Sequence, residues 1–137
     1  MPALIMPTEG RIYVLDRWSP GGNNLWIWLF KNNHTVTDAT VYSDLTNADF
    51  AGYSRQHPTW SAAADDGLGN GETHPGTITF SFSSGSPTNT IYGVAVSPDS
   101  AGIVSKILVA VNLATPKVMA SPGDSLIFDL SVLQGQF

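Results

Sequence analysis

The chain has 137 residues, no cysteine, a net charge of −5 at pH 7 and only 12% charged residues. This length suits a single domain that buries roughly two thirds of its unfolded surface without metal or disulfide support. The lack of cysteine excludes structural disulfides and thiolate chemistry. The Lys and Arg residues are scattered, which argues against the positive patch that tight nucleic-acid binding needs. The low charge predicts a surface that is either rich in Ser, Thr and Asn or partly buried against a partner.

Residues 1–10 predict an extended arm in front of one domain over residues 11–137. Prolines at positions 2 and 7 fix φ and lack an amide donor, so helix is disfavoured there. The apolar run Leu4, Ile5 and Met6 is too short, and lacks the basic start, for a signal peptide. No segment approaches the ~20 apolar residues of a membrane helix.

Short apolar segments that alternate with turns predict β-strands along the rest of the chain. The turns are expected at the Ser-Pro pairs 19–20, 86–87, 97–98 and 121–122, because proline pre-sets φ and serine can cap a turn. The expected strands are 12–15, 25–30, 40–45, 77–83, 91–96, 104–111 and 125–133.

Two of these segments are especially informative about burial. Residues 25–30 are continuously apolar, which is typical of a strand buried on both faces. In 77–83, Ile78, Phe80 and Phe82 alternate with Thr and Ser, which indicates a half-buried strand. One helical turn is expected at 46–50 and a long loop at 61–76. The pattern therefore predicts an all-β fold, an antiparallel β-sandwich or jelly roll.

Candidate chemistry is sparse. Asp65, Asp66 and Glu72 lie in a Gly-rich stretch that could offer oxygens to calcium, but their spacing is not that of an EF-hand loop. Carboxylates in such a loop do not supply the rigid pair that glycoside hydrolysis needs. The histidines at 34, 57 and 74 lack zinc-ligand spacing, and no nucleophile elbow occurs. We expect no catalytic residue, no metal and no cofactor, and hence no enzyme.

The tryptophans are the main candidates for contacts. Trp26 and Trp28 lie on one face of the 25–30 strand, so they form core or a subunit interface, or else an open platform that stacks on sugar rings. Trp18 and Trp60 lie in turn-rich stretches and suit a partner contact better. The expected partner-binding residues are Leu4, Ile5, Met6, Trp18 and Trp60.

Residues 26–53 carry a distinctive string. An apolar strand ends in Leu29-Phe30-Lys31-Asn32-Asn33, a Thr-containing turn follows, and the string closes with Phe50-Ala51-Gly52-Tyr53. It resembles a family of small structural proteins of tailed bacteriophages, as do 91–93 and 123–126. The first 24 residues and the 61–76 stretch depart from the pattern.

The resemblance implies a virion component, either a head decoration (cement) protein or a minor tail-associated protein. We then expect the major capsid protein or other virion proteins as partners, a homo-oligomer such as a trimer, and assembly on the capsid surface in the host cytoplasm. The arm would lie on the capsid or on a neighbouring subunit. The alternative is a carbohydrate- or receptor-binding β-sandwich module of the virion.

The same string has a structural interpretation. Asn32-Asn33 suits a turn after a buried strand, since Asn tolerates positive φ. Gly52 suits a left-handed corner or a close backbone approach. Phe50 and Tyr53 are expected in the core, where the Tyr53 hydroxyl needs a partner.

Overall fold

The computed structural model describes residues 4–5, 26–58, 64–65, 71–73, 76–97, 106–129 and 132–134. Within these residues the secondary structure is almost entirely strand, and the single helical element is one turn of 3-10 helix. The elements are β1 (Trp26–Phe30), η1 (Tyr42–Asp44), β2 (Ala64–Asp65), β3 (Gly71–Thr73), β4 (Thr77–Ser81), β5 (Asn89–Ser97), β6 (Val109–Met119), β7 (Ser125–Asp129) and β8 (Val132–Gln134). The all-β prediction is confirmed. No helix in this part of the chain is long and apolar enough to cross a membrane.

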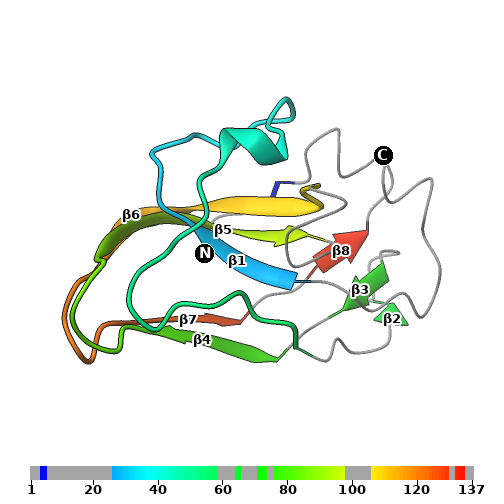
Figure 1. Ribbon diagram of the computed structural model, residues 1–137. Coiled ribbons are helices and arrows are strands. Elements are labelled where there is room, and N and C mark those ends of the chain that lie inside the picture. Colours follow the sequence, from blue (N-terminus) through cyan, green and yellow to red (C-terminus); the bar gives the residue numbers. More distant parts are fainter. Residues whose placement is uncertain are drawn as a thin grey trace.

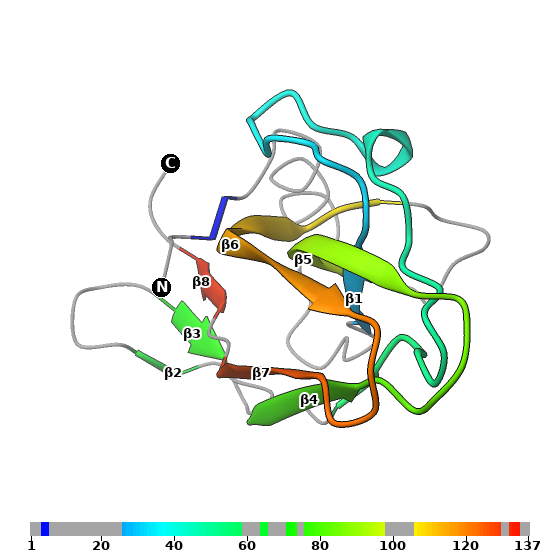
Figure 2. The same cartoon turned by 90° about the vertical axis from the view of Figure 1, so that its left-hand side faces the viewer.

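The strands form antiparallel sheets with the orders β1–β5–β6, β2–β3–β8 and β4–β7. The β1–β5–β6 sheet lies over the β4–β7 pair, with β2, β3 and β8 beside them (Figures 1 and 2). Most pairings join strands far apart in the chain, such as Trp28 of β1 with Ala95 of β5.

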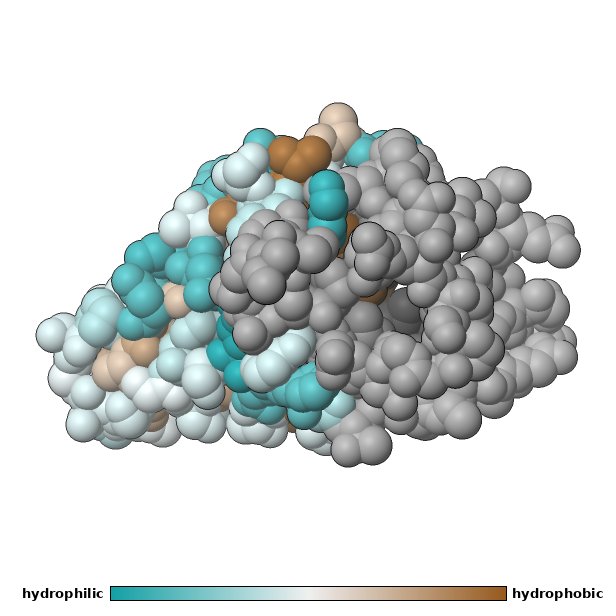
Figure 3. Space-filling view, turned by 45° about the vertical axis from the view of Figure 1, so that its right-hand side comes forward, coloured by the Kyte–Doolittle hydropathy of each residue, from teal (hydrophilic) through white to brown (hydrophobic). Residues whose placement is uncertain are grey.

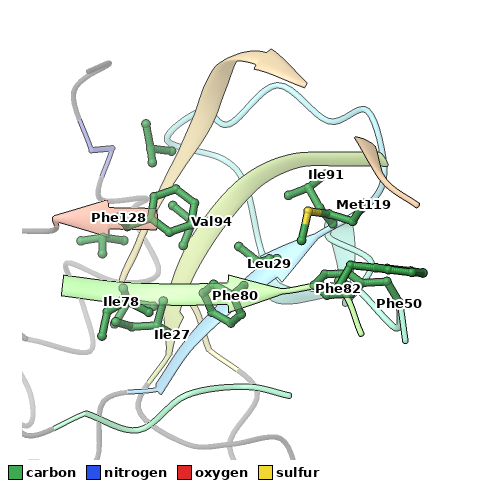
Figure 4. Close-up of a cluster of buried hydrophobic side chains, with 14 residues drawn as sticks. Ile27, Leu29, Phe50, Ile78, Phe80, Phe82, Ile91, Val94, Met119 and Phe128 are labelled. Atoms are coloured by element: carbon green, nitrogen blue, oxygen red, sulfur yellow. The ribbon is translucent and has the colours of Figure 1, made fainter. Parts of the chain in front are cut away.

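One large apolar cluster lies between the β1–β5–β6 sheet and the β4–β7 pair, and we call it the inner cluster. Side chains from β1, β4, β5 and β7 point toward one another in it (Figure 4). Burial of each large side chain here contributes roughly 1.5–3 kcal/mol. Its members are Ile27, Leu29, Ala48, Phe50, Ile78, Phe80, Phe82, Ile91, Val94, Val96, Val109, Val111, Met119 and Phe128.

A second cluster, the outer cluster, covers the opposite face of the β1–β5–β6 sheet. It contains Trp28 and Phe30 of β1 together with Val36 and Leu45 from the connection that follows β1. Ala95, Ile107 and Ala110 complete it. β1 thus buries both faces, as its continuous apolar sequence predicts, because its side chains alternate between the two clusters.

Asparagine side chains fix the connection between β1 and the 46–56 segment. Asn32 donates from Nδ2 to the Asp44 carbonyl at 2.8 Å and accepts the Thr46 N–H at Oδ1 at 2.7 Å. Asn112 of β6 does the same, accepting the Val36 N–H at 2.8 Å and donating to the His34 carbonyl at 2.6 Å. These contacts satisfy backbone groups that have no strand partner.

Several local expectations are confirmed. Ile78, Phe80 and Phe82 are buried while their Thr and Ser neighbours are exposed. Phe50 is buried, and Gly52 has φ 88° with Ser83 against its backbone. Turns occur at Ser86-Pro87, where the peptide is cis, and at Ser121-Pro122.

Other expectations are wrong at the level of single elements. Segment 40–45 is not a strand, because the Asp44 carboxylate accepts the Val41 N–H at 3.0 Å and closes the turn of η1. The helical turn expected at 46–50 is absent, since Asn47 bridges to Phe30 and Lys31 donates to the Thr46 carbonyl, both across the edge of β1. The expected 61–76 loop contains β2 and β3, which pair with each other.

The strands near the C-terminus also differ from their expected bounds. β6 begins at Val109 and runs on to Met119 through Pro116. A bulge makes this possible: Ile91 pairs with Lys117 and Gly93 with Asn112, so residues 113–116 stand opposite Tyr92 alone. The single strand expected at 125–133 is divided into β7 and β8. The strand expected at 12–15 lies outside the described residues.

Candidate interaction site

The ionisable residues do not gather into a reactive centre in the described part of the chain. His34 Nε2 lies 3.1 Å from Thr40 Oγ1, and His57 stacks on Trp26 with ring centroids 4.6 Å apart. Among these residues, no group of three His, Asp or Glu side chains could hold a metal ion. Asp65 and Glu72 lie on the paired strands β2 and β3, while Asp66 and His74 lie outside the described residues.

The two neighbouring tryptophans of β1 have different environments. Trp28 is fully buried and donates from Nε1 to Ser97 Oγ at 2.9 Å. Trp26, at the start of the strand, is half-buried beneath His57. Trp28 is therefore core, and the pair offers no open platform of two indoles for sugar rings.

Arg55 lies against Trp28, a contact that no feature of the sequence predicts. Its guanidinium carbon is 4.5 Å from the centroid of the Trp28 ring and 5.6 Å from that of Tyr42. Its Nη2 donates to the Tyr42 hydroxyl at 2.6 Å. Its Nε and Nη1 are buried without a hydrogen-bond partner in the described part of the chain. The aromatic faces thus supply the main compensation for burying this charge.

Leu4 and Ile5 lie against the chain's own β6. Ile5 donates to the Ala110 carbonyl at 2.8 Å and accepts the Ala110 N–H at 2.9 Å, which extends the β1–β5–β6 sheet by one bridge. Leu4 packs against the inner cluster and Ile5 against the outer cluster. The segment therefore contacts both faces of the sheet edge.

Of the five residues expected to bind a partner, the structure places Leu4 and Ile5. It brings these two together on β6, and both are half-buried. Met6, Trp18 and Trp60 lie outside the described residues. Sequence reasoning did not identify Ala110 as the partner of the arm, because nothing in a β6 sequence distinguishes an edge from the middle of a sheet.

The exposed side of the β4–β7 pair forms a second surface, which we call the outer β4–β7 face. It consists of Thr77, Thr79 and Ser81 from β4 with Ile127 and Asp129 from β7. Ile127 is 64% exposed and stands opposite Thr79. Only Asp129 carries a charge here, so the surface is a hydroxyl-lined ribbon around one apolar side chain.

Elsewhere in the described part of the chain, the large exposed apolar residues are isolated. Val41 is 40% and Val118 is 55% exposed, and they belong to different elements. On the coloured part of the surface in Figure 3, hydrophobic residues are separated by hydrophilic ones.

Comparison of the chain with protein-family models, with curated proteins and with solved structures gives no match. The resemblance to phage structural proteins therefore rests on the residues quoted for it and stays a prediction.

Proposed function

We propose that the protein is a non-enzymatic structural component of a phage virion, a capsid decoration (cement) protein that binds the outer capsid surface and stabilises the head. The resemblance in residues 26–53 supplies the class of protein. The observation that carries the proposal in the structure is the outer β4–β7 face, with Ile127 exposed among hydroxyl side chains. Charged residues are depleted at the centres of protein interfaces, and on this face the one charged residue, Asp129, lies at the end of β7.

The proposal includes a finer description of the fold. The β1–β5–β6 sheet and the β4–β7 pair enclose the inner cluster between them, which supports a β-sandwich or jelly roll. A homo-oligomer, with a trimer as the expected form, would repeat the contact face on the capsid lattice. Light scattering after size-exclusion chromatography measures the mass that tests this part.

Binding to heads assembled without the protein tests the function. The variant Ile127→Asp places a charge at the centre of the proposed contact, and its occupancy on heads should fall at least ~10-fold. The matched control is Val41→Asp, which adds the same charge at another exposed position and should bind as the unchanged chain does. Failure of the unchanged chain to bind heads overturns the proposal. Equal binding of the two variants shows that the contact lies elsewhere.

The carbohydrate-binding alternative has less support. Its platform of paired indoles requires Trp28 on the surface, and Trp28 is fully buried. Among the described residues, the stacked Trp26 and His57 rings remain as a candidate contact. A change in tryptophan fluorescence on titration with glycans, lost in Trp26→Leu, would favour it over the decoration role.

A further inference from the structure

We propose that Leu4 and Ile5 are an exchangeable segment: in an assembly, Ile5 of one copy pairs with Ala110 on β6 of a neighbouring copy. The partner is a second copy of this chain. The inference goes beyond the proposed function, because it concerns contacts between copies and requires no capsid.

The segment is held by backbone pairing to one sheet edge and by its two side chains. Two backbone hydrogen bonds join Ile5 to Ala110, and the side chains of Leu4 and Ile5 enter the inner and outer clusters. Leu4 and Ile5 of any copy can make the same contacts on the β6 of any other. Exchange of identical elements between protomers conserves these interactions and is therefore a low-cost route to oligomers.

The chain between the segment and β1 is long enough for exchange. Twenty residues, 6–25, separate Ile5 from Trp26 (25 − 5 = 20). Fully extended, this length spans up to ~66 Å, whereas a domain of this size has a radius of gyration of about 14 Å. The segment can therefore reach a sheet edge on an adjacent copy.

The concentration of copies decides whether the segment pairs with its own β6 or with the β6 of another copy. For a connection of about twenty residues that can span the two sites, the effective concentration of the segment at its own β6 is on the order of millimolar. In micromolar solution, pairing of the segment with the β6 of its own chain is therefore favoured over pairing with another copy. Copies held side by side present their β6 edges at a comparable local concentration, so exchange competes in an assembly or in a millimolar solution.

Engineered cysteines can measure exchange directly, because the chain has none of its own. Ile5 and Ala110 form an antiparallel hydrogen-bonded pair, for which a Cα separation of about 5.5 Å is typical. This separation lies in the range that a disulfide spans. Both side chains contact the outer cluster, so they lie on the same face of the sheet.

The experiment mixes two full-length single variants, Ile5→Cys and Ala110→Cys, at millimolar and at micromolar concentration under mild oxidation. We expect a disulfide-linked dimer on a non-reducing gel at millimolar concentration and at least ~10-fold less at micromolar concentration. A mixture of Ile5→Cys with Val118→Cys reports random collision, because Val118 is an exposed residue of the same strand.

The double variant I5C/A110C is the internal reference. It should close within one chain at micromolar concentration, which shows that the geometry permits the bond. If it closes while the mixed single variants give no more dimer than the Val118 mixture, exchange is overturned. If it does not close, the pairing itself is overturned.

Should A110C fail to fold by circular dichroism, the pair L4C and V111C tests the same register on the inner-cluster side. Neither result depends on capsid binding, so failure here is distinct from failure of the decoration role.

Discussion

The Tyr53 hydroxyl accepts a hydrogen bond from the backbone N–H of Leu29 at 3.1 Å. Leu29 lies on β1, whose free edge is otherwise covered by the 46–56 segment through backbone bonds such as Ala48 N–H to the Leu29 carbonyl at 2.9 Å. The hydroxyl thus replaces a strand carbonyl at a point where that segment provides none. It also donates to Asn47 Oδ1 at 2.8 Å, so it links two residues of this segment beside β1.

Removal of this hydroxyl should destabilise the fold. Tyr53→Phe keeps the ring beside Phe50 and Phe80 but leaves the buried Leu29 N–H without an acceptor. We expect a loss of about 1–3 kcal/mol in the free energy of unfolding, measured in urea. Tyr92→Phe is the control and should change it by less than about 0.5 kcal/mol, since the described residues offer the Tyr92 hydroxyl no partner. Equal losses in the two variants would contradict this role.

The same tyrosine predicts a dependence of stability on alkaline pH. Burial raises the pKa of Tyr53 from 10.0 to about 12, against the opposing effects of the Leu29 N–H and of Arg55. The folded state therefore holds the proton where the unfolded state has lost it, so the stabilisation is complete below pH 10 and is lost as pH rises toward 12. Urea titrations between pH 9 and 12 should show this decline, and Tyr53→Phe should reduce it. An unchanged slope in the variant would show that another group is responsible.

The hydrogen-bonded pair of Asn89 and Asp49 leads us to expect a different dependence of stability on pH. Asn89 donates from Nδ2 to Asp49 Oδ1 at 2.9 Å and accepts the Asp49 N–H at 2.8 Å. Asn89→Ala should cost about 1–3 kcal/mol in the free energy of unfolding, because these groups lose their partners. Asn89→Asp should cost more at pH 7, since the introduced carboxylate faces the Asp49 carboxylate.

The difference between these two variants should shrink on acidification. Repulsion raises the folded-state pKa of the introduced carboxyl above its unfolded value, so the penalty grows as pH rises past the unfolded pKa and disappears below it. Urea unfolding at pH 4 and pH 7 gives the comparison. A constant difference between the variants would mean that the two carboxyls do not interact.

The features predicted from the sequence are those set by neighbours along the chain. Burial of β1 on both faces and the alternation around Phe80 follow from local periodicity, and the Gly52 corner follows from the backbone freedom of glycine. Segment 40–45 has the composition of a strand, yet the Asp44 side chain closes a turn there. β6 passes Pro116 because a bulge removes the demand for its N–H.

The candidate site depends on contacts between distant residues and so was only partly accessible to sequence reasoning. An apolar arm suggested Leu4 and Ile5, but their partner Ala110 lies more than a hundred residues away and carries no distinguishing chemistry. Arg55 between Trp28 and Tyr42 is likewise a product of tertiary packing. The exposure of Ile127 has a local basis, since it lies out of phase with buried Phe128 on β7.

Gly93 of β5 shows how closely β1 and β6 approach that strand. It pairs with Phe30 on one side and Asn112 on the other, and a Cβ atom at this position would collide with the Phe30 ring and the Val111 carbonyl oxygen. Gly93→Ala should therefore lower the free energy of unfolding by at least ~3 kcal/mol. Gly85→Ala is the control: its Cβ meets open space, and its φ of 85° costs only about 1–2 kcal/mol.

A second variant separates the clash with the Phe30 ring from the clash with the Val111 backbone carbonyl. In Phe30→Leu the smaller side chain gives the new methyl group room, so Gly93→Ala should cost at least ~1 kcal/mol less there than in the unchanged chain. Urea unfolding of the four proteins measures this coupling. If Gly93→Ala costs the same in both backgrounds, the clash with the Val111 carbonyl oxygen alone determines the loss. If it costs no more than Gly85→Ala, the close approach of Phe30 to β5 is not a feature of the folded protein.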